Sequence, residues 1–173
     1  ILLATSRLLD GEEDRNWLAK ATLSQAEFME KVHAGQIRGI DPKSPLEGMV
    51  DWEGKVKLLG WSMDDRTVSR GKKLRLHLYF KSNKAVRSSH KIFVHMDRSG
   101  HRIHGDHWPL AVSQGKDGKH CIGCFQMDHW IPGDIIVDTF EREVPLGAPS
   151  GETDINLGLF NPQNDKRLKI SRW

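Results

Sequence analysis

Potential metal-binding side chains are concentrated in one part of the chain. Six of the nine histidines lie between residues 95 and 129, and the same range contains Asp106 and both cysteines. Imidazole, thiolate and carboxylate groups are the donors that zinc takes, and a closed zinc site needs four of them in a tetrahedron. Two groups could supply several donors each: Cys121 and Cys124 with His120 or His129, and His104, Asp106 and His107 with His95. The segment favours hydrogen-bonded structural histidines, with a zinc site as the alternative.

The spacing within each group limits what it can bind. A single Cys-x-x-Cys lacks the second pair of a zinc finger, and His-x-Asp-His does not match the His-Glu-x-x-His motif. If residues 104–107 form a strand, His104 and Asp106 share one face while His107 points away from it. All three could bind one ion only if the chain turned at this point.

The two cysteines, Cys121 and Cys124, could form a small disulfide loop, half of a metal site or a free thiol pair. A thioredoxin-like thiolate would need a helix that begins at the first cysteine, and residues 125–133 offer little helix. If the chain is extracytoplasmic, we expect the pair to close a disulfide that stiffens this segment.

Other catalytic machinery is not indicated. The sequence has no Gly-x-Ser-x-Gly elbow and no common phosphate-binding loop. Glycoside hydrolysis needs two carboxylates across a cleft, and sequence spacing does not give that separation. The sequence therefore favours a non-catalytic protein without a cofactor, and a zinc-dependent hydrolase-like protein is the alternative.

Length and composition indicate one globular domain with a modest extension. The chain has 173 residues, of which 38% are hydrophobic and 28% charged. No apolar run approaches the roughly 18 to 20 residues of a membrane span. Because the chain begins without methionine, an upstream signal or membrane anchor stays open.

The net charge of +3 is small but unevenly distributed. No acidic residue occurs between Asp65 and Asp97, whereas nine lysines and arginines do. If they shared one face, they would attract an anionic surface, although basic residues that alternate with apolar ones are more typical of a solvated strand face. We expect no specific nucleic-acid partner. The candidate surface residues are Lys72, Lys73, Arg75 and Lys81.

The N-terminal part of the chain has a helical pattern that ends at a proline-rich turn. Ser24 and Glu27 have the spacing of a capping box, and apolar residues at helical intervals follow. This pattern predicts a helix at about 24–34. Two prolines at 42 and 45 then interrupt any regular element. We therefore divide the chain into residues 1–45, a helical extension and linker, and residues 46–173, the main domain.

After residue 45 the apolar period changes from 3.6 to 2. Leu74, Leu76, Leu78 and Phe80 alternate with Arg75, His77, Tyr79 and Lys81, which predicts a strand with one buried face. Residues 56–61, 91–96, 135–140 and 154–160 behave similarly, with turn signals between them. Because no long helices lie between these strands to make crossovers, the pattern predicts an antiparallel β-sandwich.

Residues 53–171 contain a series of short motifs in a fixed order: Phe93-Val94-His95, Gly105-Asp106-His107-Trp108-Pro109, Trp130-Ile131-Pro132-Gly133-Asp134, Gly158-Leu159-Phe160 and Arg167-Leu168. Their order resembles that of a bacterial β-sandwich module that is typically attached to the C-terminus of membrane-anchored glycosyltransferase-like proteins. The resemblance implies an Ig-like or jelly-roll-like sandwich, extracytoplasmic, without catalytic chemistry. This chain departs from the pattern at Thr153 or Asp154, where the module has tyrosine, and in an insertion at 110–129 that carries the cysteines.

The shared pattern also implies a ligand site. Its candidate residues are His95, Asp106, His107, Trp108 and Trp130, which could converge on one rim of the sandwich. Sugars stack on flat aromatic faces while aspartate and histidine take their hydroxyls, so we expect a carbohydrate or a protein partner of the cell envelope. The alternative is that both tryptophans belong to the core.

Overall fold

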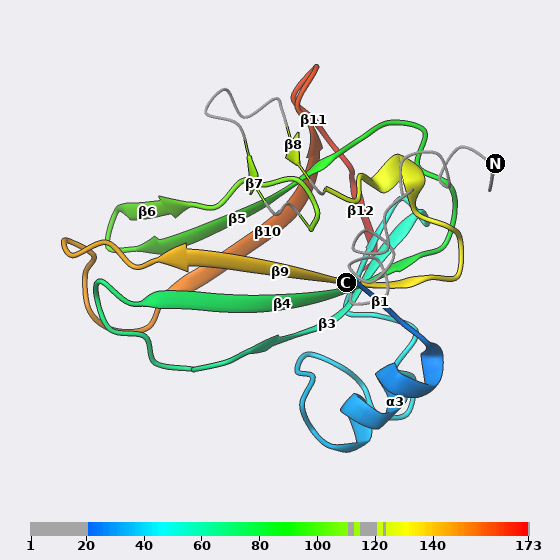
Figure 1. Ribbon diagram of the computed structural model, residues 1–173, viewed down its shortest axis with the longest axis horizontal. Helices are drawn as coiled ribbons and strands as arrows, with labels where there is room; N and C mark the ends of the chain where they lie inside the picture. Colours follow the sequence, from blue (N-terminus) through cyan, green and yellow to red (C-terminus); the bar gives the residue numbers. More distant parts are fainter. Residues whose placement is uncertain (1–20, 111–112, 115–120, 123, 173) are drawn as a thin grey trace.

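The computed structural model describes residues 21–110, 113–114, 121–122 and 124–172, and it is a two-layer antiparallel β-sandwich (Figure 1). One sheet has six strands in the order β1-β9-β4-β3-β2-β12, and the other has four in the order β11-β10-β5-β6. The six strands are β1 (Thr22–Leu23), β9 (Ile135–Glu143), β4 (Lys73–Ser82), β3 (Val56–Met63), β2 (Val50–Trp52) and β12 (Ile170–Arg172). The four strands are β11 (Lys166–Arg167), β10 (Asp154–Asn161), β5 (Lys91–Arg98) and β6 (His101–His104). The predicted fold class is confirmed.

Three smaller elements complete the described part of the chain. Strands β7 (Ser113–Gln114) and β8 (Cys121–Ile122), which follow β6 in the chain, pair as a two-stranded antiparallel sheet. A short 3₁₀ helix, η1 (Met127–His129), precedes β9, and one α-helix, α3 (Gln25–His33), follows β1. Among the described residues, no helix is long and apolar enough to cross a membrane.

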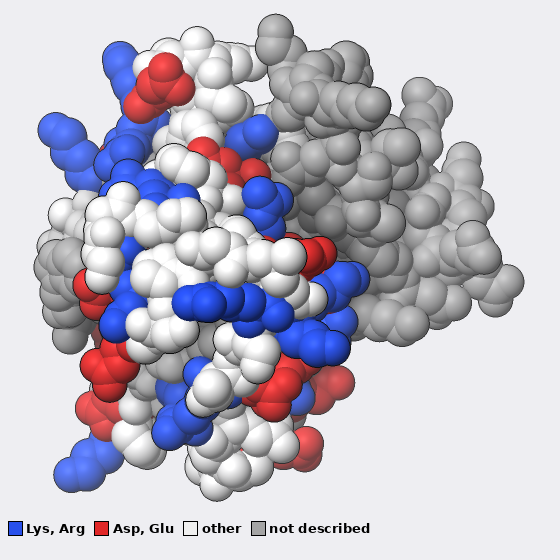
Figure 2. All heavy atoms as spheres, turned by 90° about the vertical axis from the view of Figure 1, so that its left-hand side faces the viewer, with Lys and Arg blue, Asp and Glu red and all other residues white. Residues whose placement is uncertain are grey.

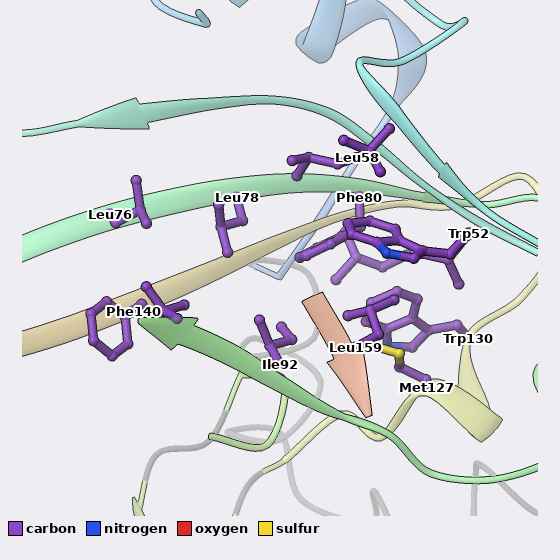
Figure 3. Close-up of a cluster of buried hydrophobic side chains, with 14 of the residues drawn as sticks. Trp52, Leu58, Leu76, Leu78, Phe80, Ile92, Met127, Trp130, Phe140 and Leu159 are labelled. Carbon is purple, nitrogen blue, oxygen red and sulfur yellow. The ribbon is translucent and has the colours of Figure 1, made fainter. Parts of the chain in front are cut away.

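Strand alternation builds the core between the two sheets. Leu74, Leu76, Leu78 and Phe80 of β4 all point inward, as their period of two predicts. They meet Ile92 from β5 and Leu159 from β10, and Figure 3 shows these side chains converging from the two layers. The predicted strands at 56–61, 91–96, 135–140 and 154–160 are likewise confirmed.

Side chains on the two faces of β3 belong to two different apolar clusters. The pairing of β3 with β4 shifts at a β-bulge between Leu58 and Gly60. Because side chains alternate along a strand, Leu58 packs in the main core while Leu59 faces the opposite side of the sheet. There Leu59 joins a second cluster with Tyr79 of β4 and Phe28 and Val32 of α3. Part of the outer face of the six-stranded sheet is therefore covered by the helix.

The capping box predicted for the N-terminal helix is confirmed. The Ser24 hydroxyl accepts a hydrogen bond from the Glu27 amide, and the Glu27 carboxylate accepts one from the Ser24 amide. The pKa of Glu27 is lowered by two hydrogen bonds to its carboxylate, first the one from the Ser24 hydroxyl and second the one from the Ser24 amide. Because β1 pairs with β9 and α3 packs on the sheet, residues 21–34 belong to the sandwich rather than to a detached extension. The division at residue 45 stays a prediction, and the possible element in residues 1–20 lies outside the described residues.

Replacing Phe28 should show how much the helix contributes to the fold. Phe28 is fully buried against Tyr79, and we expect Phe28→Ala to lower the free energy of unfolding by about 3–5 kcal/mol. Urea denaturation followed by tryptophan fluorescence measures the loss. The exposed Glu30→Ala in the same helix is the control and should change the unfolding free energy by no more than about 0.5 kcal/mol. Equal stability of the two variants would contradict the packing described.

Candidate functional site

A buried ion pair holds the chain after β6. His107 Nε2 donates to Asp138 Oδ2 at 2.8 Å, and His107 Nδ1 donates to the Gly105 carbonyl at 2.8 Å. Because both ring nitrogens face acceptors, the arrangement favours the doubly protonated imidazolium. Burial acts to lower the pKa of His107, but the Asp138 carboxylate and the Gly105 carbonyl outweigh it, and the pKa is raised. The Asp138 side chain is fully buried.

This pair connects the two sheets. The backbone of His107 forms two hydrogen bonds with Ile92 of β5 and so continues the edge of the four-stranded sheet, whereas Asp138 lies on β9 of the six-stranded sheet. The second carboxylate oxygen of Asp138 accepts the Leu110 amide at 2.8 Å. The Asp138 carboxylate thus holds the loop of residues 105–110 at two points, His107 and Leu110.

Because the His107 side chain points inward, the side chain of the preceding residue points outward. Since side chains alternate along an extended chain, Asp106 and His104 point away from the core, and both are exposed. His95 lies directly opposite His104 in the pairing of β5 with β6. His95 Nε2 donates to Asp106 Oδ1 at 3.0 Å. Three of the predicted residues, His95, His104 and Asp106, therefore come together, and His107 points away from them, as the strand argument predicted.

A row of aromatic rings crosses this outer face of the four-stranded sheet, which we call the open face. The ring centroids of Phe160 and Phe93 are 6.4 Å apart, those of Phe93 and His95 are 5.0 Å apart, and those of His95 and His104 are 4.9 Å apart. The row thus runs from β10 over β5 to β6. Gly158 leaves room for it, because a Cβ at this position would collide with the Phe93 ring. None of these four rings is completely buried.

Polar side chains border the row. Arg102 donates two hydrogen bonds to the Asp97 carboxylate, at 2.6 and 2.7 Å, and Asn156 Nδ2 donates to the same carboxylate at 2.9 Å. The hydrogen bonds from Arg102 are the main reason that the pKa of Asp97 is lowered. On the other side of the row, the Arg167 guanidinium lies 4.8 Å from the centre of the Phe93 ring. The open face therefore combines flat rings with fixed donors and acceptors.

The two tryptophans predicted for this site lie in the interior, which corrects the expectation of exposed stacking faces. Trp130 is 3% exposed, packs against Phe80 and donates from Nε1 to the Phe125 carbonyl. Trp108 is also buried, and the Lys91 ammonium lies 5.2 Å from its ring centre. Both tryptophans therefore follow the alternative in which they belong to the core. The physical reason is area, since a buried indole removes more apolar surface from water than any other side chain.

Of the remaining predicted zinc ligands, the two whose side chains the structure describes, Cys124 and His129, do not belong to the His95 cluster. Cys124 is disulfide-bonded, so its sulfur is not a thiolate. His129 is exposed and lies 3.8 Å from the Asp128 carboxylate. His120 lies outside the described residues, and so does the side chain of Cys121.

Two of the four residues expected to dock on an anionic surface have acidic partners. Lys73 and Arg75 both contact Glu141, at 2.6 Å each. Arg75 also contacts Asp64, which lowers the pKa of Asp64 together with the stronger effect of His77. Lys72 is exposed, and Lys81 is partly buried on β4. Figure 2, which faces the end of the sandwich where β4 begins, shows basic and acidic groups interspersed. The nine basic residues therefore do not act as one uniform surface.

At this end of the sandwich an open groove of about 1340 Å³ lies between the sheets and residues 144–153. Two arginines of its lining hold that loop. Arg70 donates from Nε to the Ala148 carbonyl at 2.6 Å and from its terminal nitrogen to Ser150. Arg98 donates to the Glu152 carbonyl. These contacts give both arginines a structural role.

Sequence reasoning missed Asp138, Asp97, Arg102 and Asn156 as members of the site or its support. Asp138 is the single charged residue in an otherwise apolar stretch of the β9 strand, Ile135–Phe140, and a buried strand rarely carries an unpaired carboxylate. That signal could have predicted a buried partner for it. In the sequence alone, nothing distinguishes the other three from ordinary polar surface residues. Only the pairing of the strands brings them together.

Comparison with protein-family models found no match, and comparison with curated proteins found no significant match.

Removing the buried carboxylate should destabilise the protein strongly. Asp138→Ala leaves His107 and the Leu110 amide without their acceptor, and we expect a loss of about 3–5 kcal/mol in the free energy of unfolding. Chemical denaturation measures it. Glu143→Ala, at the exposed end of the same strand, is the matched control and should be nearly neutral. A loss below about 1 kcal/mol in Asp138→Ala would refute the role of the pair.

The same pair predicts a pH dependence of stability. The pKa of His107 is raised in the folded protein, so its contribution is complete below its ordinary pKa of about 6.5 and is lost as the pH rises through the folded value. The free-energy difference between the wild type and His107→Gln should therefore be larger at about pH 6 than at about pH 9. Urea denaturation of both proteins at the two pH values measures it. If the free-energy difference between the two proteins instead grew with pH, the predicted direction of the pH dependence would be wrong.

Proposed function

We propose that this chain is a non-catalytic binding module that recognises carbohydrate through the open face of its four-stranded sheet. The observation that carries the proposal is the row of Phe160, Phe93, His95 and His104, which provides a continuous aromatic surface across three strands. Pyranose rings present C–H surfaces that pack on such rings, and their hydroxyls need donors and acceptors beside them.

The polar border supplies those groups in a form suited to hydroxyl recognition. Arg102 and Asn156 both donate hydrogen bonds to Asp97, which limits the conformations of the three side chains before a ligand arrives. A ligand that meets side chains already ordered loses less conformational entropy on binding. Asp106 and Asn156 are exposed and lie on opposite sides of the row. A sugar on the rings could therefore contact both.

An extracytoplasmic location in the bacterial envelope is part of the proposal. The disulfide at Cys124 supports it, because disulfides persist in oxidising compartments and are rare in the cytosol. The glycans and the proteins of the envelope are then the partners to test. A protein partner would use the same face and is the outcome to consider if no glycan binds.

Glycan binding can be tested with two substitutions on the open face. Phe93→Leu keeps an apolar side chain over Gly158 but removes the aromatic ring, and Asn156→Ala removes one donor and one acceptor. We expect each to weaken binding by about two- to tenfold. A glycan array with the purified chain identifies the ligand, and isothermal titration calorimetry then compares the variants.

The matched control is Asn164→Ala, which removes an equally exposed asparagine from the turn between β10 and β11. It should bind like the wild type. Absence of binding to every glycan of a broad envelope panel would contradict the proposal. So would a ligand whose affinity depends on Asn164 but not on Phe93 or Asn156.

A further inference from the structure

Three metal-binding side chains meet at one edge of the open face. One donor atom from each of His95, His104 and Asp106 can be chosen so that all three lie within 4.8 Å of one another. In a tetrahedral zinc centre, two ligand atoms at about 2.0–2.1 Å from the ion are roughly 3.3 Å apart. Side-chain rotations that move the donor atoms by about 1 Å would therefore bring them to the spacing of zinc ligands.

The backbone holds the three residues in place. His95 and His104 are directly opposite each other on paired strands, which keeps their Cβ atoms close. Asp106 is held by its neighbour, because His107 is anchored to Ile92 through the backbone and to Asp138 through its side chain. The His95 ring also packs on Phe93. Two of the ligands thus lie on paired strands, and the third lies in a segment that is anchored to both sheets, which gives the rigidity that a precise ligand set requires.

The donor types select the class of metal. Two imidazoles and one carboxylate suit zinc and related divalent transition metals, whereas calcium and magnesium prefer oxygen ligands alone. His104 and Asp106 are exposed. A fourth position therefore faces solvent and would take water or a ligand atom, as in zinc sites with three protein ligands.

We propose that His95, His104 and Asp106 form a three-ligand site for a divalent transition metal, zinc in the first place. The ion takes the place of the proton that His95 Nε2 now donates to Asp106 Oδ1. The proposed set of ligands differs from both groups predicted from the sequence, since it includes neither His107 nor the cysteines. It does not depend on the carbohydrate proposal, because both the ligands and the test are defined without a sugar.

The test is a zinc titration of the whole purified chain, stripped of metal with a chelator and kept under non-reducing conditions. Isothermal titration calorimetry with Zn²⁺ should give one equivalent, with a Kd in the micromolar range or below. His104→Ala and Asp106→Asn should each weaken binding by at least about tenfold. Both residues are exposed, so the melting temperature without metal should stay within a few degrees of the wild type. Co²⁺ provides a second readout, since the visible absorption of bound Co²⁺ reports its coordination.

Two other histidines provide the controls. His101→Ala removes an exposed histidine from the same strand, β6, but outside the cluster, and His129→Ala removes the histidine beside Asp128. Both should bind Zn²⁺ like the wild type. The proposal is overturned if Zn²⁺ does not bind, or if His101→Ala or His129→Ala weakens binding as much as His104→Ala. Glycan titrations in parallel series, with chelator and with Zn²⁺, let the two proposals fail separately.

Discussion

The contact between His107 and Asp138 is the constraint on which the arrangement of the open face depends. A charged pair in the interior is tolerated only when its remaining hydrogen-bonding groups are satisfied, and here the Gly105 carbonyl and the Leu110 amide do so. Meeting that requirement brings the chain after β6 against β9 of the opposite sheet. The edge of one layer is thereby fixed to β9 of the other.

The open face follows from this contact through simple alternation. With His107 directed inward, Asp106 must be directed outward, and it reaches His95. Two glycines make the packing on either side possible. A side chain at Gly105 would collide with Phe140 in the core, and one at Gly158 would collide with Phe93 on the surface. The same short segment therefore contributes to the core, to the link between the sheets and to the candidate site.

The two faces of the sandwich differ in a way that bears on function. The outer face of the six-stranded sheet is partly covered by α3, where Phe28 and Val32 bury Leu59 and Tyr79. The outer face of the four-stranded sheet carries aromatic rings, two histidines and a network of charged and amide groups instead. His104 is exposed and the other three rings are half-buried, and a partner that covers them removes their remaining apolar surface from water, which is favourable. Carbohydrate recognition and metal binding are both proposed for this second face, and the two proposed sites share His95, His104 and Asp106.

The sequence by itself determined the class of the fold, the helix with its capping box and the inward face of β4, because these depend on local periodicity and on hydrogen bonds within a few residues. It also determined that His104 and Asp106 share a face and that His107 does not.

Tertiary structure decided the rest. Trp108 and Trp130 became buried, Trp130 within the main core between the sheets, and Asp138 became the partner of His107 across 31 positions of the chain. Which exposed residues meet on the open face depended on the pairing of β5 with β6 and β10, since contacts between strands are set by register and not by distance along the sequence.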